Sequence, residues 1–294
     1  MQLRPYRALT ALALLASAAC SPDLAAPEMA ATNIGLASAT SATGAQIITD
    51  AEIVRQAENT APTASWVLFT RTAASIGQFQ VGPGTVPEGV GSLGLATPGS
   101  GDKVFLFNYD HVGTRLDALT TLSYSTYRSA GSAQQLPALN IQVDYNGAAE
   151  GGFTTLVFEP VYNTGQGAVT NDVWQTWDAL ANGSGRWWST RDIPGVCAFD
   201  CFVAWGGIVA ANPDAVITGG IGINQGSGNP GLVAAVDQLV IGVGAEPVTY
   251  DFEPYVTAAT RETCREDGWG TARRADGSVF KNQGDCVSYV QTGR

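Results

Sequence analysis

Lysine and histidine are almost missing from this chain of 294 residues, in which Lys103 and Lys281 are the only lysines and His111 is the only histidine. Charged residues make up 14% of the chain, and the net charge is −11. Proteins that bind nucleic acid need a basic surface for the phosphates. The charge balance therefore argues against nucleic acid as a partner, and equally against binding to an anionic lipid surface.

The single histidine also narrows the catalytic chemistry. A Ser-His-Asp or Cys-His mechanism would have to use His111 as its base, and the sequence contains no G-x-S-x-G nucleophile elbow. His111 lies in the stretch NYDHVGT, where a surface or loop histidine is the simpler interpretation. A histidine-dependent hydrolase is not expected.

Long amphipathic helices are missing from residues 61–254 as well. Glycine is abundant, with 35 residues, and β-branched or aromatic runs alternate with turn signals. Strands that recur about every ten residues are typical of a sandwich or barrel. We expect an all-β fold, a jelly-roll-like antiparallel sandwich of two sheets. The clearest strands are expected at 65–72, 103–109, 122–127, 138–145, 153–159, 216–224, 236–243 and 248–252, with a short helix at 203–212.

Two strand pairings can be predicted from these segments. We expect the first strand, 65–72, to pair at one edge with the strand AVDQLVIG, residues 235–242. In 138–145, Leu139 and Ile141 alternate with Asn140 and Gln142, so one face is apolar and the other polar. This strand and 153–159 are predicted to form an antiparallel pair around a loop that contains Asn146-Gly147.

The N-terminus has the features of an export signal. Residues 1–19 combine Arg4 and Arg7 with a short apolar run and small residues, and Cys20 follows directly. The segment looks like a bacterial lipoprotein signal, which implies lipidation of Cys20 as the only link to a membrane; such signals prefer Leu where this chain has Ser17. The alternative is cleavage near Ala18 or Ala19, followed by plain secretion. Residues 20–60 are rich in Ala, Thr, Ser and Pro and are expected to form a tether.

The C-terminal residues 255–294 are more charged and polar, and we expect a separate mini-module there. The four remaining cysteines predict disulfides in an exported protein, and local pairing is favoured among the three connectivities. A unit this short has too little core to fold without such a bond. The spacing of Cys197, Cys201, Cys264 and Cys286 is not that of a zinc site, so no metal is assigned to them.

Several strings carry a resemblance. LSYSTYRS (122–129), the hairpin ending in GGFTTLVFEP (151–160), WQTWDA (174–179) and GGIGINQGSGNPG (219–231) resemble a family of uncharacterised exported bacterial proteins. AVDQLVIG followed by YDFEP is loosely similar to the last strands of carbohydrate-binding and concanavalin-like jelly rolls, which implies the architecture alone. The tail resembles a short cysteine-containing module of secreted bacterial proteins, which implies export.

Aromatic rings beside amides and carboxylates are the chemistry of sugar recognition, because ring faces pack on C–H patches and polar groups bind hydroxyls. Strand alternation sends one ring of the Trp187-Trp188 pair into the core. The candidate ligand-binding residues are therefore Trp174, Gln175, Trp177, Asp178, Arg186, Trp187, Asn224 and Gln225, with Trp188 as the neighbour of Trp187. No cofactor is expected, apart from a candidate structural calcium ion at Asp237 and Asp251.

Three functions remain open at this point. The first is binding of a polysaccharide or cell-surface glycan without catalysis. The second is polysaccharide cleavage, either by paired acids such as Glu159 and Glu253 or by a lyase using Tyr124, Tyr127, Arg128 or His111. The third is a structural role in the cell envelope. The sequence does not indicate an oligomeric state.

Overall fold

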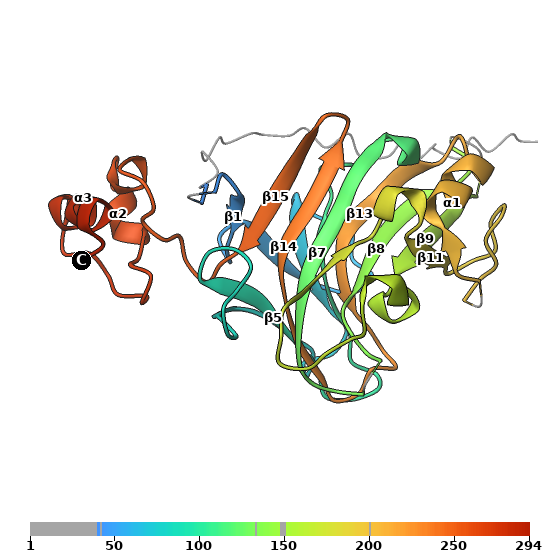
Figure 1. Cartoon of the computed structure of the whole chain (residues 1–294), viewed down its shortest axis with the longest axis horizontal. Coiled ribbons are helices and arrows are strands. Elements are labelled where there is room, and N and C mark those ends of the chain that lie inside the picture. Colours follow the sequence, from blue (N-terminus) through green and yellow to red (C-terminus); the bar gives the residue numbers. More distant parts are fainter. Residues whose placement is uncertain (1–39, 42, 133, 148–150, 200) are drawn as a thin grey trace, which may run out of the picture. The chain divides into compact units, whose positions relative to one another are not determined.

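The computed structural model describes residues 40–41, 43–132, 134–147, 151–199 and 201–294. The expected signal segment and Cys20 lie outside this range. The described chain forms two β-sheets packed face to face, which confirms the all-β two-sheet sandwich. Figure 1 shows β15, β14 and β7 side by side in the first sheet.

Sheet A is built around β14 (Leu232–Val243), which pairs with β7 (Leu119–Ala130) along one edge. Along its other edge, β14 pairs first with β5 (Gly91–Thr97) and then with β15 (Glu246–Phe252). The outer strands of this sheet are β4 (Ile76–Val81) beside β5, β1 (Gln46–Ile48) beside β15, and β10 (Gln175–Asp178) beside β7.

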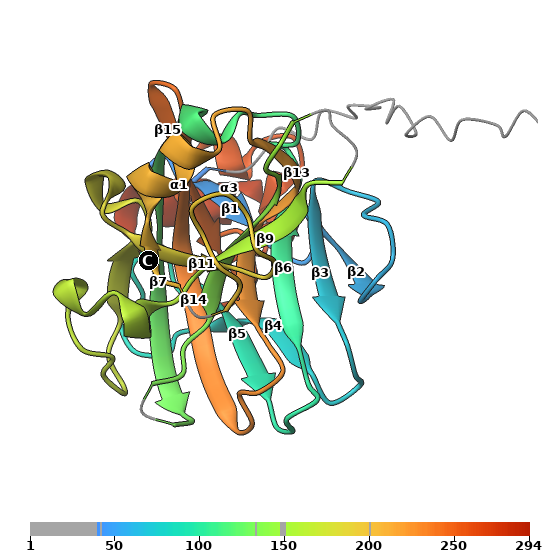
Figure 2. The same cartoon turned by 90° about the vertical axis from the view of Figure 1, so that its right-hand side faces the viewer.

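Sheet B has eight strands, and β6, β3 and β2 follow one another toward one edge (Figure 2). Their order across the sheet is β12 (Val203–Ala204), β11 (Arg186–Ser189), β9 (Phe153–Phe158), β8 (Ala138–Asp144), β13 (Val216–Gln225), β6 (Val104–Asn108), β3 (Trp66–Thr70) and β2 (Ile53–Ala57). The predicted antiparallel pair β8–β9 is present.

Two expectations need correction, one about a strand partner and one about the segment before the first predicted strand. The first predicted strand, β3, pairs with β2 and β6 in sheet B, whereas the AVDQLVIG strand, β14, lies at the centre of sheet A. Residues 46–57 were expected to belong to a tether, yet they supply β1 and β2, which pair in parallel with β15 and β3. Short strands of this kind lack clear alternation in the sequence. They form because they pair with strands that are distant in the chain.

The helices are short and peripheral to the sheets. Helix α1 (Trp205–Ala211) buries Trp205 and Ile208 and ends before Pro213, as predicted. Single 3₁₀ turns lie at Leu116–Ala118, Pro160–Tyr162, Thr164–Gln166, Ala181–Gly183 and Glu262–Cys264. The core between the sheets is made by alternate strand residues, among them Leu68, Leu106, Leu139, Ile223 and Tyr124.

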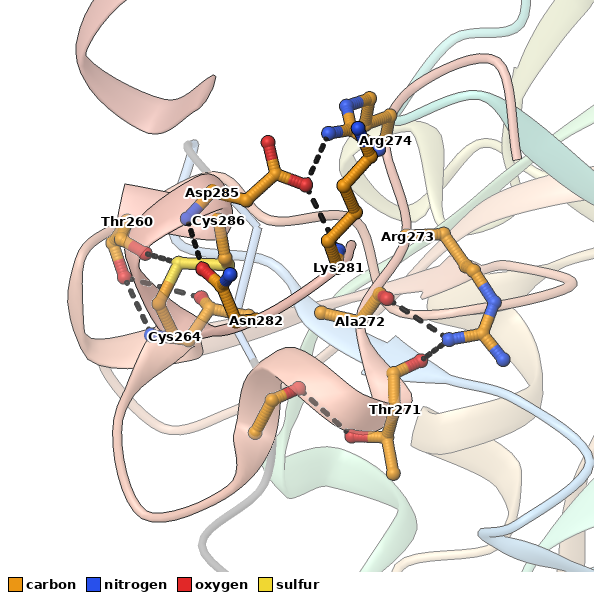
Figure 3. The surroundings of a disulfide bond; sticks show 12 residues. Thr260, Cys264, Thr271, Ala272, Arg273, Arg274, Lys281, Asn282, Asp285 and Cys286 are labelled. Atoms are coloured by element: carbon orange, nitrogen blue, oxygen red, sulfur yellow. Dashed lines mark hydrogen bonds and ion pairs between the residues drawn. A yellow bond between two sulfur atoms is a disulfide. The ribbon is translucent and has the colours of Figure 1, made fainter. Parts of the chain in front are cut away.

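The C-terminal segment has a core of its own. The Cys264–Cys286 bond joins the turn at 262–264 to α3 (Gln283–Thr292), and α2 (Gly268–Thr271) lies between them in sequence. Arg274 donates to Asp285 at 2.7 Å, and the Asn282 side chain accepts from the Asp285 amide at the start of α3 (Figure 3). Both predicted local disulfides, this one and Cys197–Cys201, are present.

A glycine at the centre of sheet B gives a test of this packing. A Cβ atom on Gly222 would lie 2.0 Å from the Leu106 carbonyl oxygen. This oxygen belongs to the backbone of a paired strand and cannot shift to make room. We expect Gly222→Ala to lower the free energy of unfolding by about 2 kcal/mol or more, because the added methyl group would press on the Leu106 carbonyl and on the Phe107 ring at the outer face of sheet B. Urea denaturation measures it. Gly165→Ala is the control, because nothing lies within 4 Å of its Cβ position; equal losses for both variants would contradict the packing described.

Candidate functional site

Two adjoining hollows lie on the face of sheet B that points away from the core. They share Lys103, Asn140, Thr155 and Asn224, so we treat them as one feature, the sheet-B groove. Its other lining residues include Glu58, Phe69, Phe105, Phe107, Tyr109, Gln142, Phe153, Glu159, Trp188, Thr190, Phe199 and Asn229.

The strand register places the main groove side chains in rows. Trp188 lies opposite Val157, Val157 opposite Asn140, Asn140 opposite Gly222, and Gly222 opposite Phe107. Residues directly opposite one another in a sheet project from the same face. Four strand spacings separate Trp188 from Phe107, which is about 19 Å. The groove is therefore long enough for an extended molecule.

The floor of the groove is made of side-chain amides. Asn140 is only 6% exposed, yet its Oδ1 atom has no hydrogen-bond partner, and the Oδ1 atom of Asn224 has none either. Gln142 is already engaged, since its Oε1 accepts from the Gly220 amide at 2.9 Å. An unpaired buried amide oxygen costs free energy unless a donor reaches it. The two Asn side chains thus place amide oxygens with unmet hydrogen-bonding capacity, enclosed by their neighbours, at the floor of the groove.

Aromatic rings flank this amide floor on both sides. Phe69 and Phe105 stack with centroids 4.9 Å apart, and Phe105 also lies 4.9 Å from Phe107. On the far side, Trp188 and Phe199 have centroids 5.3 Å apart. Glycines at 220 and 222 leave room for the Phe107 ring, because a Cβ at either position would lie within 3 Å of it.

The charges of the groove are mostly neutralised. Glu58 accepts from Lys103 at 3.2 Å and from Arg71, and the bond from Arg71 is the main cause that lowers the pKa of Glu58. Glu159 accepts from Trp188 Nε1 at 2.8 Å, while burial raises the pKa of its carboxyl group. Glu58 and Glu159 are the two acids among the described groove residues, and they line different hollows.

The structure does not bring the predicted tryptophan cluster together. Trp177 and Trp187 are fully buried in the core, where their indole nitrogens donate to Thr126 Oγ1 and to the Ala179 carbonyl oxygen. Neither ring can reach a ligand. Alternation does hold at Trp187-Trp188, and the residue that faces the groove is Trp188.

The other predicted residues are also scattered. Trp174 packs on Tyr127 in sheet A, with ring centroids 5.6 Å apart, and donates to the Pro83 carbonyl oxygen. Three further side chains hold the local backbone: Gln175 bonds Thr170 and Ala168, Asp178 caps the turn at Leu180 and Ala181, and Arg186 donates to the Phe202 carbonyl oxygen. Of the two predicted loop amides, Gln225 is buried and bonds Thr97 and Leu232, whereas Asn224 lines the groove.

The residues considered for lyase chemistry do not converge either. Tyr124 is buried in the core and donates to the Pro137 carbonyl oxygen, whereas Tyr127 packs on Trp174. The buried Arg128 donates to Asn171 and to backbone carbonyls. His111 is half-buried, and burial lowers its pKa. None of these four side chains lines the sheet-B groove.

A second polar feature lies in sheet A. Asp237, Asp251 and Glu253 are each at most 1% exposed and form the carboxylate cluster. Asp237 accepts from the Phe252 and Glu88 amides at 3.1 and 3.0 Å, and Glu253 accepts from the Val90 and Gly91 amides. Apart from the hydrogen bond that a proton can form between Asp251 and Glu253, both oxygens of Asp251 and Oε2 of Glu253 have no donor. Among the described residues, no three Asp, Glu, His or Cys side chains are arranged as a metal-binding group.

Burial and mutual repulsion govern how this cluster ionises. Burial is the main cause that raises the pKa of Asp237 to about 7 and that of Asp251 to about 9. The charge of Glu253 adds to the effect on Asp251, and burial raises the pKa of Glu253 itself. Without a cation, the cluster therefore retains protons at neutral pH.

Sequence reasoning missed Asn140, Gln142 and Phe199 as groove residues, and it named Glu159 only as a candidate acid for cleavage, paired with Glu253. The alternation in 138–145 did place Asn140 and Gln142 on the polar face, which was the available signal. No family model, no curated protein and no solved structure matches this chain. None of the helices in the described residues is long and apolar enough to cross a membrane.

The carboxylate cluster predicts a pH dependence of stability. Above about pH 4 the unfolded chain has released these protons, whereas the folded chain keeps the Asp237 proton up to about pH 7 and the Asp251 proton up to about pH 9. Rising pH therefore favours unfolding across this range. In a chelating buffer we expect the melting temperature to fall from pH 5 to pH 8. The free energy of unfolding should decrease by an amount on the order of a few kcal/mol over this range. Thermal denaturation at several pH values measures it.

Asp251→Asn should flatten this profile, since the amide cannot ionise. The matched control is Asp172→Asn, which changes an exposed acid in a turn and should leave the profile unchanged. A melting temperature that rises from pH 5 to pH 8 in the wild-type protein would refute the protonated cluster.

Proposed function

We propose that this protein binds a neutral polysaccharide or cell-surface glycan in the sheet-B groove without cleaving it. The observation that carries the proposal is the buried Asn140 side chain, whose Oδ1 atom lacks a donor on a floor flanked by Phe107 and Trp188. Sugar hydroxyls would supply that donor, and sugar C–H faces would pack on the rings.

The charge distribution favours a neutral glycan over an acidic one. Lys103, the cation that lines the groove, is already paired with Glu58, and the chain carries a net charge of −11. A uronic-acid polymer would meet repulsion without a free partner in the groove. Neutral chains meet no such penalty.

Polysaccharide cleavage is the alternative function for the same groove. Glu159 would be its acid, because burial raises the pKa of this carboxyl group. Glycoside hydrolysis uses two acids about 5–10 Å apart across the scissile bond. Glu58 lines the other hollow and is held by Arg71 and Lys103. This arrangement supports binding more than cleavage.

We also infer that the protein works outside the cytoplasm, anchored through Cys20 or secreted. The export-like segment at residues 1–19 supports this proposal. Two disulfides, Cys197–Cys201 and Cys264–Cys286, are typical of an oxidising compartment.

A second proposal concerns the carboxylate cluster, to which we assign a structural calcium ion. Asp251 and Glu253 are buried with donor-free carboxylate oxygens, and oxygen is the ligand that calcium prefers. Backbone carbonyls and water would have to complete the coordination, since three ligating side chains do not converge. The ion would displace the protons that the cluster otherwise holds.

Glycan binding is tested with the full exported chain on β-glucan, xylan, galactomannan, alginate and polygalacturonate. We expect binding to a neutral member, with no new reducing ends and no unsaturated product. Asn140→Ala and Trp188→Ala should each weaken binding about tenfold, because each removes a central contact.

The control for this experiment is Trp174→Ala, which removes a tryptophan from sheet A and should leave affinity unchanged. Thermal scans of every variant establish that it is folded. If cleavage products form, polysaccharide cleavage replaces simple binding as the proposed function. If the protein binds no polysaccharide of the panel, both proposed functions are overturned.

The calcium proposal is tested by thermal denaturation at pH 8 in millimolar calcium and in a chelator. We expect calcium to raise the melting temperature of the wild-type protein, because a ligand of the folded state stabilises it. Asp251→Asn should remove this response, whereas Asp172→Asn should keep it. An unchanged wild-type melting temperature would exclude the ion.

A further inference from the structure

Phe199 is a large apolar side chain that the fold leaves in the open. It is 60% exposed, and its backbone has a φ of +62°, in the left-handed region that bulky residues avoid. It lies inside the short ring closed by the Cys197–Cys201 disulfide. Strained backbone of this kind persists only where the surrounding structure holds it, and it concentrates at functional sites.

Several contacts hold Phe199 at the end of β11. Its backbone amide donates to the Ser189 carbonyl oxygen at 3.1 Å, and Ala198 forms a parallel bridge with Ser189. The Ala198 amide donates to Asp192 Oδ1 at 2.7 Å. The disulfide and these bonds together keep the residue in a conformation that an open loop would not favour.

The ring of Phe199 lines one end of the sheet-B groove. It lies against Trp188, with centroids 5.3 Å apart and planes inclined by 38°. Trp188 in turn donates to Glu159, and all three residues line the hollow that contains Asn140 and Asn224. An exposed aromatic ring therefore extends the Trp188 surface beside the side chains of Asn140 and Asn224.

We propose that Phe199 is a ligand-contact residue, positioned by the Cys197–Cys201 disulfide, that stacks on a sugar ring bound beside Trp188 and Glu159. This inference rests on the proposed glycan binding and names the residues that set affinity at one end of the groove. A sugar ring with an apolar C–H face would cover the exposed ring, while its hydroxyls reach Asn140, Asn224 or Glu159.

The experiment uses the full chain and the neutral polysaccharide of the panel above that the wild-type protein binds most tightly. Phe199→Ala should raise the Kd about five- to tenfold, the range for loss of one aromatic stack. Phe199→Trp should stay within about twofold of wild type, because it keeps a ring at the same position.

The control is Tyr162→Ala, which also removes an exposed, stacked aromatic ring. Tyr162 is 42% exposed and stacks on Phe202 at 3.8 Å, but it lines a different hollow. We expect its removal to leave the Kd unchanged.

The positioning role is tested by comparing the two disulfides. Replacing Cys197 and Cys201 together by Ser should weaken binding as much as Phe199→Ala does, and adding Phe199→Ala to that variant should weaken it no further. Replacing Cys264 and Cys286 together by Ser should leave the Kd unchanged.

The outcomes separate this inference from the function on which it rests. If the wild-type protein binds none of the polysaccharides, the proposed function falls and this inference falls with it. If the wild-type protein binds and Phe199→Ala binds equally well, Phe199 is no contact and only this inference is overturned. Loss of binding in both disulfide variants would overturn the specific role of Cys197–Cys201.

Discussion

The sandwich depends on one junction in β14, where this strand exchanges one neighbour for another. Val236 is the last residue paired with β5, and Leu239 is the first paired with β15. Asp237 lies between them, and its carboxylate accepts the amides of Phe252 and Glu88. Buried backbone donors need partners. Asp237 supplies them where the ladder is interrupted, and so ties β14, β15 and the loop before β5 together. The other two acids of the cluster, Asp251 and Glu253, lie beside Asp237 because they stand at the end of β15.

The groove depends on a related constraint in sheet B, which is close approach of backbone and ring. Gly220 and Gly222 carry no Cβ, so the Phe107 ring can lie across β13 without a clash. The same glycine at position 222 faces Asn140 across the strand pair. A larger residue there would cover the Asn140 side chain. Because β13 carries no side chains at these two positions, the Phe107 ring and the Asn140 side chain can line the same groove.

The two polar features differ in how their unpaired atoms are compensated. In the groove, the unpaired groups are neutral amide oxygens, enclosed beside a hollow, so a missing hydrogen bond costs less there than an unpaired charge would. In the carboxylate cluster, charged groups are enclosed between strands, so protons or a permanently held cation must offset them. Only one groove acid, Glu159, has a raised pKa, and it lacks a second acid beside it. The first feature thus supports recognition and the second supports stability.

Local sequence determined the fold class, the disulfide pairs and the polar face of β8, because alternation and cysteine spacing act over a few residues. It also indicated that one of Trp187 and Trp188 points inward. Only the tertiary structure decided which one, since that depends on which face of β11 meets the core. It also separated Trp174, which packs on Tyr127 of sheet A, from Trp188, which belongs to β11 of sheet B. Glu159 directly follows β9, and Phe199 bonds to Ser189 of β11. The pairing of these strands with β8 brings both residues to the hollow that Asn140 lines, and such long-range pairing leaves no short-range signal in the chain.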